Sequence, residues 1–142
     1  MIMNSLFTSQ KIKNLEIKNR IVLPPMVCFT FAEENGFVSE KNIKHYESIA
    51  KSGTGLIIVE ATCVSKKGRL STDQLGIWSD KHIDGLSKIA QVCHENGAKV
   101  FIQLHHAGFR TPKSIDEDAI TSSDYKCAQH GWQLDGESPL WG

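Results

Sequence analysis

Gln103 is the polar residue of this 142-residue sequence whose position best suits ligand binding. It directly follows the apolar run at residues 100–102, so it stands at the carboxyl end of a predicted strand. A buried amide costs free energy unless it is hydrogen-bonded, and an amide offers both a donor and an acceptor. Such a side chain can pair with the mixed polar edge of a heterocyclic ligand. The alternative is an amide satisfied by the neighbouring main chain.

Two other segments that follow apolar runs are candidates for contact with a flat ligand. Pro24 and Pro25 fix φ and remove two main-chain donors, so the chain leaves the first strand as a stiff wall. The alternative there is an ordinary strand-ending turn. Ala61 follows Glu60 at the predicted end of the second strand, where a small side chain lets a ligand approach the main chain. Simple packing is the alternative for Ala61.

The histidine and cysteine residues do not predict a metal site. His105 and His106 are adjacent, and adjacent residues of a strand face opposite sides, so they are poor joint ligands. The cysteines lie far apart without a CxxC pair, which also excludes a small disulfide scaffold. They are Cys28, Cys63, Cys93 and Cys127.

The elements that must position these residues are short apolar strands separated by amphipathic helices. The runs at residues 21–23, 56–59 and 100–102 are continuous, which is typical of parallel strands covered on both faces. Between them, apolar residues recur at helical spacing over Glu40–Lys51 and residues 81–96. The order strand, helix, strand, helix, strand predicts an α/β fold with a parallel sheet.

Local signals support these boundaries. Ser39 is placed to cap the first helix, Ser79 or Asp80 to cap the second, and Gly97 stands where a C-terminal glycine belongs. A small hairpin is expected before the first strand, with residues 11–12 and 15–17 on either side of the turn residue Asn14.

The connections between the elements are of two lengths. Each helix returns to its next strand within a few residues, at 52–55 and 97–98, whereas each strand is followed by a long segment, at 24–38 and 61–78. Loops longer than about 12 residues are usually functional or disordered. Because α/β folds bind ligands at the carboxyl ends of their strands, the long loops lie on the expected ligand-binding side.

Composition excludes several classes of protein. Acidic and basic residues balance at 16 each, which argues against a nucleic-acid-binding surface. No apolar run approaches the roughly 18 residues of a membrane span, so no membrane partner is expected and a cytoplasmic location is predicted. From residue 126 to 142 no period is visible, and an irregular tail is expected there.

Four spaced segments resemble the Old Yellow Enzyme family. They are LFTSQKIKNLEIKNRIVLPPM, GLIIVEATCV, GRLSTDQLGIWSDKHIDGL and NGAKVFIQLHHAG, in this order. The resemblance implies a TIM (β/α)8 barrel, bound FMN, NAD(P)H as reductant, and a small enone or enoyl substrate whose activated double bond is reduced. It also implies that Pro25, Met26 and Val27 run along the isoalloxazine ring through main-chain contacts, that Ala61 lies near the pyrimidine edge, and that Gln103 hydrogen-bonds this ring.

The sequence also departs from the family pattern. Val27 stands where one subgroup carries a cysteine, and Phe29 stands where that subgroup tends to have tyrosine. Both departures favour the 2,4-dienoyl-CoA-reductase-like branch. His106 matches the histidine of the pattern Gln-Leu-x-His-Ala-Gly and is expected to position a loop. Phe109 displaces the arginine that often follows the glycine, which leaves Arg110 one place on.

A TIM barrel needs about 200–250 residues or more, and three predicted strands account for the N-terminal portion of one. Residues 1–125 are therefore expected to form an incomplete FMN-binding barrel domain. The groups that hold the substrate come from later in the family's chain, so no catalytic residue is named here. The alternative is a truncated, inactive chain without stable cofactor binding. Another TIM-barrel enzyme, such as an aldolase, is not favoured, because this sequence lacks the strand-end lysine expected of one. The sequence leaves the oligomeric state open.

Overall fold

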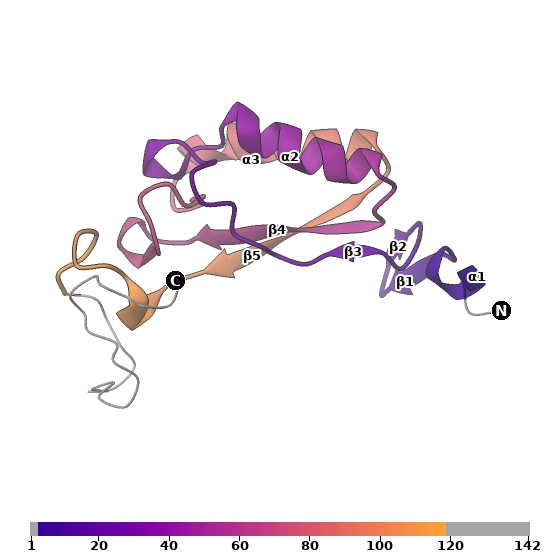
Figure 1. Ribbon diagram of the computed structural model, residues 1–142, viewed down its shortest axis with the longest axis horizontal. Helices are drawn as coiled ribbons and strands as arrows, with labels where there is room; N and C mark the ends of the chain where they lie inside the picture. The colour runs from indigo at the N-terminus through magenta and orange to yellow at the C-terminus, as the bar shows by residue number, and fades with distance from the viewer. Residues whose placement is uncertain (1–2, 119–142) are drawn as a thin grey trace.

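The structure, a computed structural model, describes residues 3–118, which form a parallel sheet with two helices on one face (Figure 1). The three strands follow the order β3-β4-β5 and are all parallel. The predicted α/β class is thereby confirmed, whereas the predicted tail at residues 126–142 lies outside the described residues. The bounds are β3 Val22–Leu23, β4 Leu56–Cys63, β5 Lys99–His105, α2 Glu40–Lys51 and α3 Ile83–Glu95.

A short helix and a hairpin precede the sheet at the amino ends of its strands (Figure 1). After α1 (Met3–Leu6), β1 (Gln10–Ile12) pairs antiparallel with β2 (Leu15–Ile17), which confirms the predicted hairpin. Asn14 lies in the turn, but Lys13 takes the left-handed conformation, with φ of +51°.

The predicted caps set the helix boundaries. Ser39 Oγ accepts hydrogen bonds from the main-chain nitrogens of Lys41 and Asn42, at 3.1 and 3.4 Å, so α2 begins as predicted. Ser79 caps a 3₁₀ turn, Asp80–His82, and α3 continues from it at Ile83. Helix α3 ends at Glu95, and Gly97 follows with φ of +73°.

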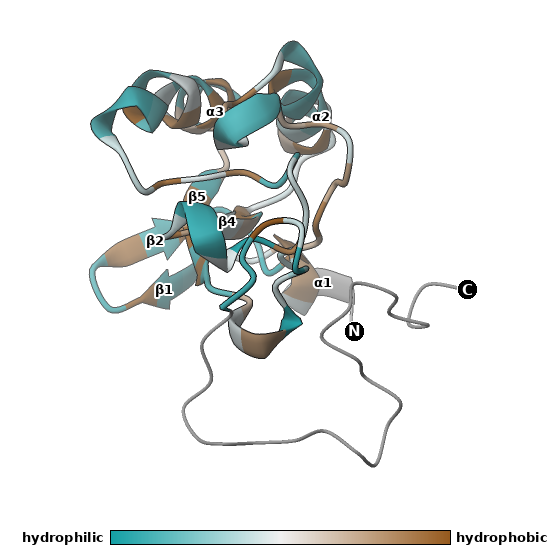
Figure 2. Cartoon of the chain, turned by 90° about the vertical axis from the view of Figure 1, so that its left-hand side faces the viewer, coloured by the Kyte–Doolittle hydropathy of each residue, from teal (hydrophilic) through white to brown (hydrophobic). Residues whose placement is uncertain are grey.

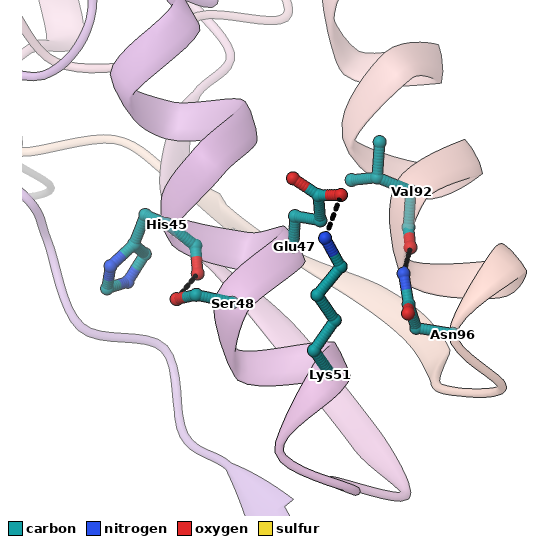
Figure 3. A network of polar contacts seen from close by, with 6 residues as sticks. All are labelled: His45, Glu47, Ser48, Lys51, Val92 and Asn96. Carbon is teal, nitrogen blue, oxygen red and sulfur yellow. Dashed lines mark hydrogen bonds and ion pairs between the residues drawn. The ribbon is translucent and has the colours of Figure 1, made fainter.

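Polar side chains of α2 and at the end of α3 make local hydrogen bonds and an ion pair (Figure 3). Lys51 Nζ lies 2.6 Å from Glu47 Oε1, but exposed ion pairs of this kind contribute little to stability. Asn96 Nδ2 donates to the Val92 carbonyl oxygen at 2.8 Å at the end of α3. The helices are therefore held mainly by their apolar faces rather than by these contacts.

The core lies between the helices and one face of the sheet, and Figure 2 shows α2 and α3 together on that side. Ile57 and Val59 of β4 are 0% and 1% exposed, and they pack with Tyr46 of α2 and Ile89 of α3. The other face differs: Phe101 of β5 is 43% exposed. No segment among residues 3–118 covers this second face of β5, as expected of an incomplete barrel.

Replacement of Ile57 by alanine should cost about 2–5 kcal/mol of unfolding free energy, because it leaves a cavity in this core. Ile12→Ala is the matched control, since Ile12 is 40% exposed in the hairpin, and it should change stability by only about 0.5 kcal/mol. Urea unfolding followed by circular dichroism measures both. Equal losses would contradict the assignment of the core.

Candidate functional site

A β-bulge shapes the carboxyl edge of the sheet. The register of β4 against β5 steps from Val59↔Ile102 to Thr62↔Leu104, so Glu60 and Ala61 together oppose the single residue Gln103. Bulges of this kind bend a strand and re-aim its side chains. The strand also continues to Cys63, so the prediction that β4 ends before Ala61 is wrong. Beyond the bulge, β4 pairs with β5 again, and the sequence pattern does not reveal the bulge.

The three predicted ligand-contacting segments meet at this edge. Ala61 and Gln103 are opposite one another across the bulge. Pro25 lies two residues beyond Leu23, which pairs with Ile57, so it reaches the level of Val59. The sheet is parallel, and all three segments therefore stand at the carboxyl ends of their strands. Their contact with a cofactor stays a prediction.

The exposure of these residues differs from one to the next. Gln103 is exposed and its amide makes no hydrogen bond to any of residues 3–118, so the expectation of a buried amide is wrong for this part of the chain. Met26 is 57% exposed, and Pro25 and Val27 are half-buried. Ala61 is buried, at 4% exposure. The edge thus presents an accessible amide and an apolar wall.

The buried amide at this edge is Gln74, which sequence reasoning missed. Its side chain is fully buried, and Oε1 accepts a hydrogen bond from the Leu70 main-chain nitrogen at 2.7 Å. Nε2 donates to the Ala61 carbonyl oxygen at 2.8 Å and lies 3.2 Å from His105 Nδ1. Gln74 therefore ties the loop after β4 to the ends of both strands. It lies in a loop without periodicity, so no sequence signal marks it.

A second missed residue is Glu60, a carboxylate that is only 1% exposed. Its Oε1 accepts from the Tyr46 hydroxyl at 3.2 Å, and its Oε2 accepts from the Cys28 main-chain nitrogen at 2.7 Å. Burial raises the pKa of Glu60, and these hydrogen bonds oppose that shift. The signal available in the sequence was a charged residue continuing the apolar run of residues 56–59, where a charge is retained only with partners.

Cys28 is a half-buried thiol beside the predicted flavin-contacting stretch. Its Sγ lies 3.5 Å from His45 Nε2. Burial, with the nearby Glu60 carboxylate, raises the pKa of the Cys28 thiol to about 11, and burial lowers the pKa of His45. Both shifts favour the uncharged forms, so the Cys28 thiol and the His45 imidazole do not form an ion pair.

The two adjacent histidines have separate partners. His105 lies against Gln74, whereas His106 Nδ1 accepts from the Gly108 main-chain nitrogen at 3.1 Å. The His106 ring packs against Gly68 so closely that a Cβ there would lie 2.4 Å from it. Residues 3–118 contain no cluster of three His, Cys, Asp or Glu side chains that could hold a metal ion.

The long loops after β3 and β4 are joined by main chain and glycines. Gly76 N donates to the Gly36 carbonyl oxygen at 3.0 Å, and a Cβ added at Gly36 would lie 2.7 Å from that nitrogen. A Cβ at Gly76 would lie 2.2 Å from the Trp78 ring. The Arg69 guanidinium lies 5.4 Å from the centroid of the same ring, and its Nη1 donates to the Thr72 carbonyl oxygen. Arg69 and Trp78 therefore hold the loop after β4 in its fold.

Comparison with known proteins identifies the family. The model of the NADH:flavin oxidoreductase / NADH oxidase family matches residues 5–138. The chain belongs to this family. A curated relative, the NADPH dehydrogenase of Halalkalibacterium halodurans, is 42% identical over 129 residues, which cover 85% of this chain and 38% of the relative. The NADPH dehydrogenase of a Geobacillus species is 45% identical over 118 residues, which cover 83% of this chain and 34% of the relative.

Solved structures give the same answer for the fold. The Old Yellow Enzyme homologue of Zymomonas mobilis superimposes with a TM-score of 0.71 at 32% identity, over 78% of this chain and 30% of that one. The Old Yellow Enzyme of Trypanosoma cruzi gives 0.71 at 27% identity, over 87% and 33%. The predicted resemblance and the N-terminal barrel portion are confirmed. The chain spans about a third of the length of the relatives it matches.

Gln74→Leu should destabilise the fold, because it leaves the Leu70 N–H and the Ala61 carbonyl without their partner. Each buried group left unpaired costs on the order of 1–3 kcal/mol. Gln103→Leu is the matched control, since the exposed Gln103 amide has no partner among residues 3–118, and it should stay within about 0.5 kcal/mol of the parent. Urea unfolding compares the two. The same loss in both variants would refute the tie made by Gln74.

Alkylation of Cys28 should be slow at neutral pH and should accelerate steadily as the pH rises, because the pKa of this thiol is raised to about 11. The rate is measured by iodoacetamide labelling and mass spectrometry of the Cys28 peptide from pH 7 to about 9.5, a range in which an ordinary thiol with pKa near 8.5 levels off. A plateau within this range would contradict the buried neutral thiol.

Proposed function

We propose that the intact protein is an FMN-dependent NAD(P)H oxidoreductase. Family membership supports the flavin, and the relatives named NADPH dehydrogenase support the reductant. The single structural observation that carries the proposal is the exposed amide of Gln103, which lies opposite the bulge and at the same edge as Pro24 and Pro25. An amide whose donor and acceptor have no partner among residues 3–118 matches the mixed polar edge of a flavin.

The residues at this edge fit FMN. Gln103 would hydrogen-bond the pyrimidine ring, and Ala61 is small enough for the ring to approach β4. Pro25, Met26 and Val27 would contact the isoalloxazine ring through their main chain, which the two prolines stiffen. When bound, FMN supplies the hydride chemistry, and these residues supply its position and its exclusion from water.

The proposed substrate is a small enone or enoyl compound with an activated double bond. Phe29, at the same edge, lacks the hydroxyl that would hydrogen-bond a substrate carbonyl. This favours the dienoyl-CoA-reductase-like branch. No residue of this chain is proposed as a catalytic acid or base. A cytoplasmic location also belongs to the proposal. Among residues 3–118, no helix has the length and apolar character needed to cross a bilayer.

Gln103→Leu should weaken FMN binding in the intact protein, because it removes hydrogen bonds at a desolvated ring edge. The expected loss is about 1–3 kcal/mol of binding free energy. Fluorescence titration of FMN into the apoprotein measures it. Gln91→Leu is the matched control, since Gln91 is an exposed amide of α3 whose partner among residues 3–118 is Glu95. Unchanged affinity in Gln103→Leu would remove Gln103 from the site, and a parent protein without flavin binding would refute the function.

A further inference from the structure

The buried carboxylate of Glu60 connects three separate elements. It lies in β4 at the bulge, where Oε1 accepts a hydrogen bond from the Tyr46 hydroxyl of α2 and Oε2 accepts one from the Cys28 main-chain nitrogen. The Tyr46 hydroxyl in turn accepts a hydrogen bond from the Glu60 main-chain nitrogen at 3.0 Å. Both carboxylate partners are donors, so the ionised form of Glu60 is the one that this arrangement satisfies.

The bond to Cys28 has a particular consequence for the segment after β3. Pro24 and Pro25 carry no N–H, so Met26, Val27 and Cys28 provide the main-chain donors of this segment. The donor of Cys28 is taken by Glu60 at 2.7 Å, which is the short distance typical of a charge-assisted hydrogen bond. The main chain that follows Met26 and Val27 is thereby fastened to β4.

We infer that Glu60 is a positioning residue for the flavin, which acts by holding the Cys28 main-chain nitrogen and so setting where Met26 and Val27 lie. The inference rests on the proposed function. Glu60 touches neither cofactor nor substrate in this role. It holds the segment after Pro24 and Pro25 from one side, while Glu60 and its neighbour Ala61 together oppose Gln103 across the bulge. The bulge in β4 therefore sets the position of the segment after Pro24 and Pro25 relative to the Gln103 amide.

The competing explanation is that Glu60 matters only for core stability. Tyr46→Phe separates the two, because it removes the hydroxyl from the same network and leaves the Glu60–Cys28 bond in place. Glu60→Ala removes that bond. Glu60→Gln keeps an oxygen that can accept from Cys28 N–H while it removes the charge, so it tests rescue by a near-isosteric side chain.

The experiment measures two quantities in the intact protein and these three variants. Fluorescence titration gives the FMN dissociation constant, and hydrogen exchange of the apoprotein gives the protection of the Cys28 amide and of the Met26 and Val27 amides. Glu60→Ala should weaken FMN binding about tenfold or more and abolish protection of the Cys28 amide. Glu60→Gln should recover most of both, and Tyr46→Phe should keep Cys28 protection and bind FMN within about threefold of the parent.

The outcomes separate this inference from the proposed function. If Glu60→Ala binds FMN as the parent does, or if Tyr46→Phe loses as much affinity as Glu60→Ala, Glu60 is not a positioning residue even though the protein binds flavin. Retained protection of the Cys28 amide in Glu60→Ala would also overturn the inference, and that readout needs no cofactor. A parent protein that binds no FMN would refute the proposed function and this role with it.

Discussion

The arrangement at the carboxyl edge depends on one irregularity, the placing of two residues of β4 against one residue of β5. In an uninterrupted ladder, Glu60 and Ala61 would point to opposite faces and each would have its own partner on β5. The bulge instead sets the pair against Gln103. The buried carboxylate can then reach Tyr46 and Cys28 while the ladder continues to Cys63. The two sides of the candidate flavin site thus share a single backbone feature.

Short connections enter the amino end of the sheet, and long loops leave its carboxyl end. After α2 and α3 the chain re-enters the sheet within a few residues, and Gly97 makes this feasible after α3 by adopting a left-handed φ. At the opposite end, the two long loops are joined by the hydrogen bond from Gly76 N to the Gly36 carbonyl oxygen, and Gln74 ties the loop after β4 to the strand ends. The loops at the carboxyl end are therefore tied to the strand ends by hydrogen bonds.

Local rules were sufficient for the helices but not for the site. Ser39 and Gly97 mark the helix ends because capping depends on a few neighbouring residues, and Glu40–Lys51 was predicted to the residue. The bulge at Ala61 and the burial of Gln74 were missed because both depend on contacts between residues far apart in the chain. Gln103 was predicted at the carboxyl edge because a polar residue ending an apolar strand is visible in sequence, although its amide is exposed rather than buried among residues 3–118. Sequence therefore identified the edge, and tertiary contacts determined its internal bonding.

The close packing of the two long loops through Gly36, Gly76 and Trp78 has an evolutionary consequence. Surface loops usually diverge independently, because each contacts mainly solvent. Here a side chain gained at either glycine would collide with the other loop or with the indole, so a change in one must be matched by a change in the other. Exchange of segments between members of the family should therefore succeed when both loops are transplanted as a unit.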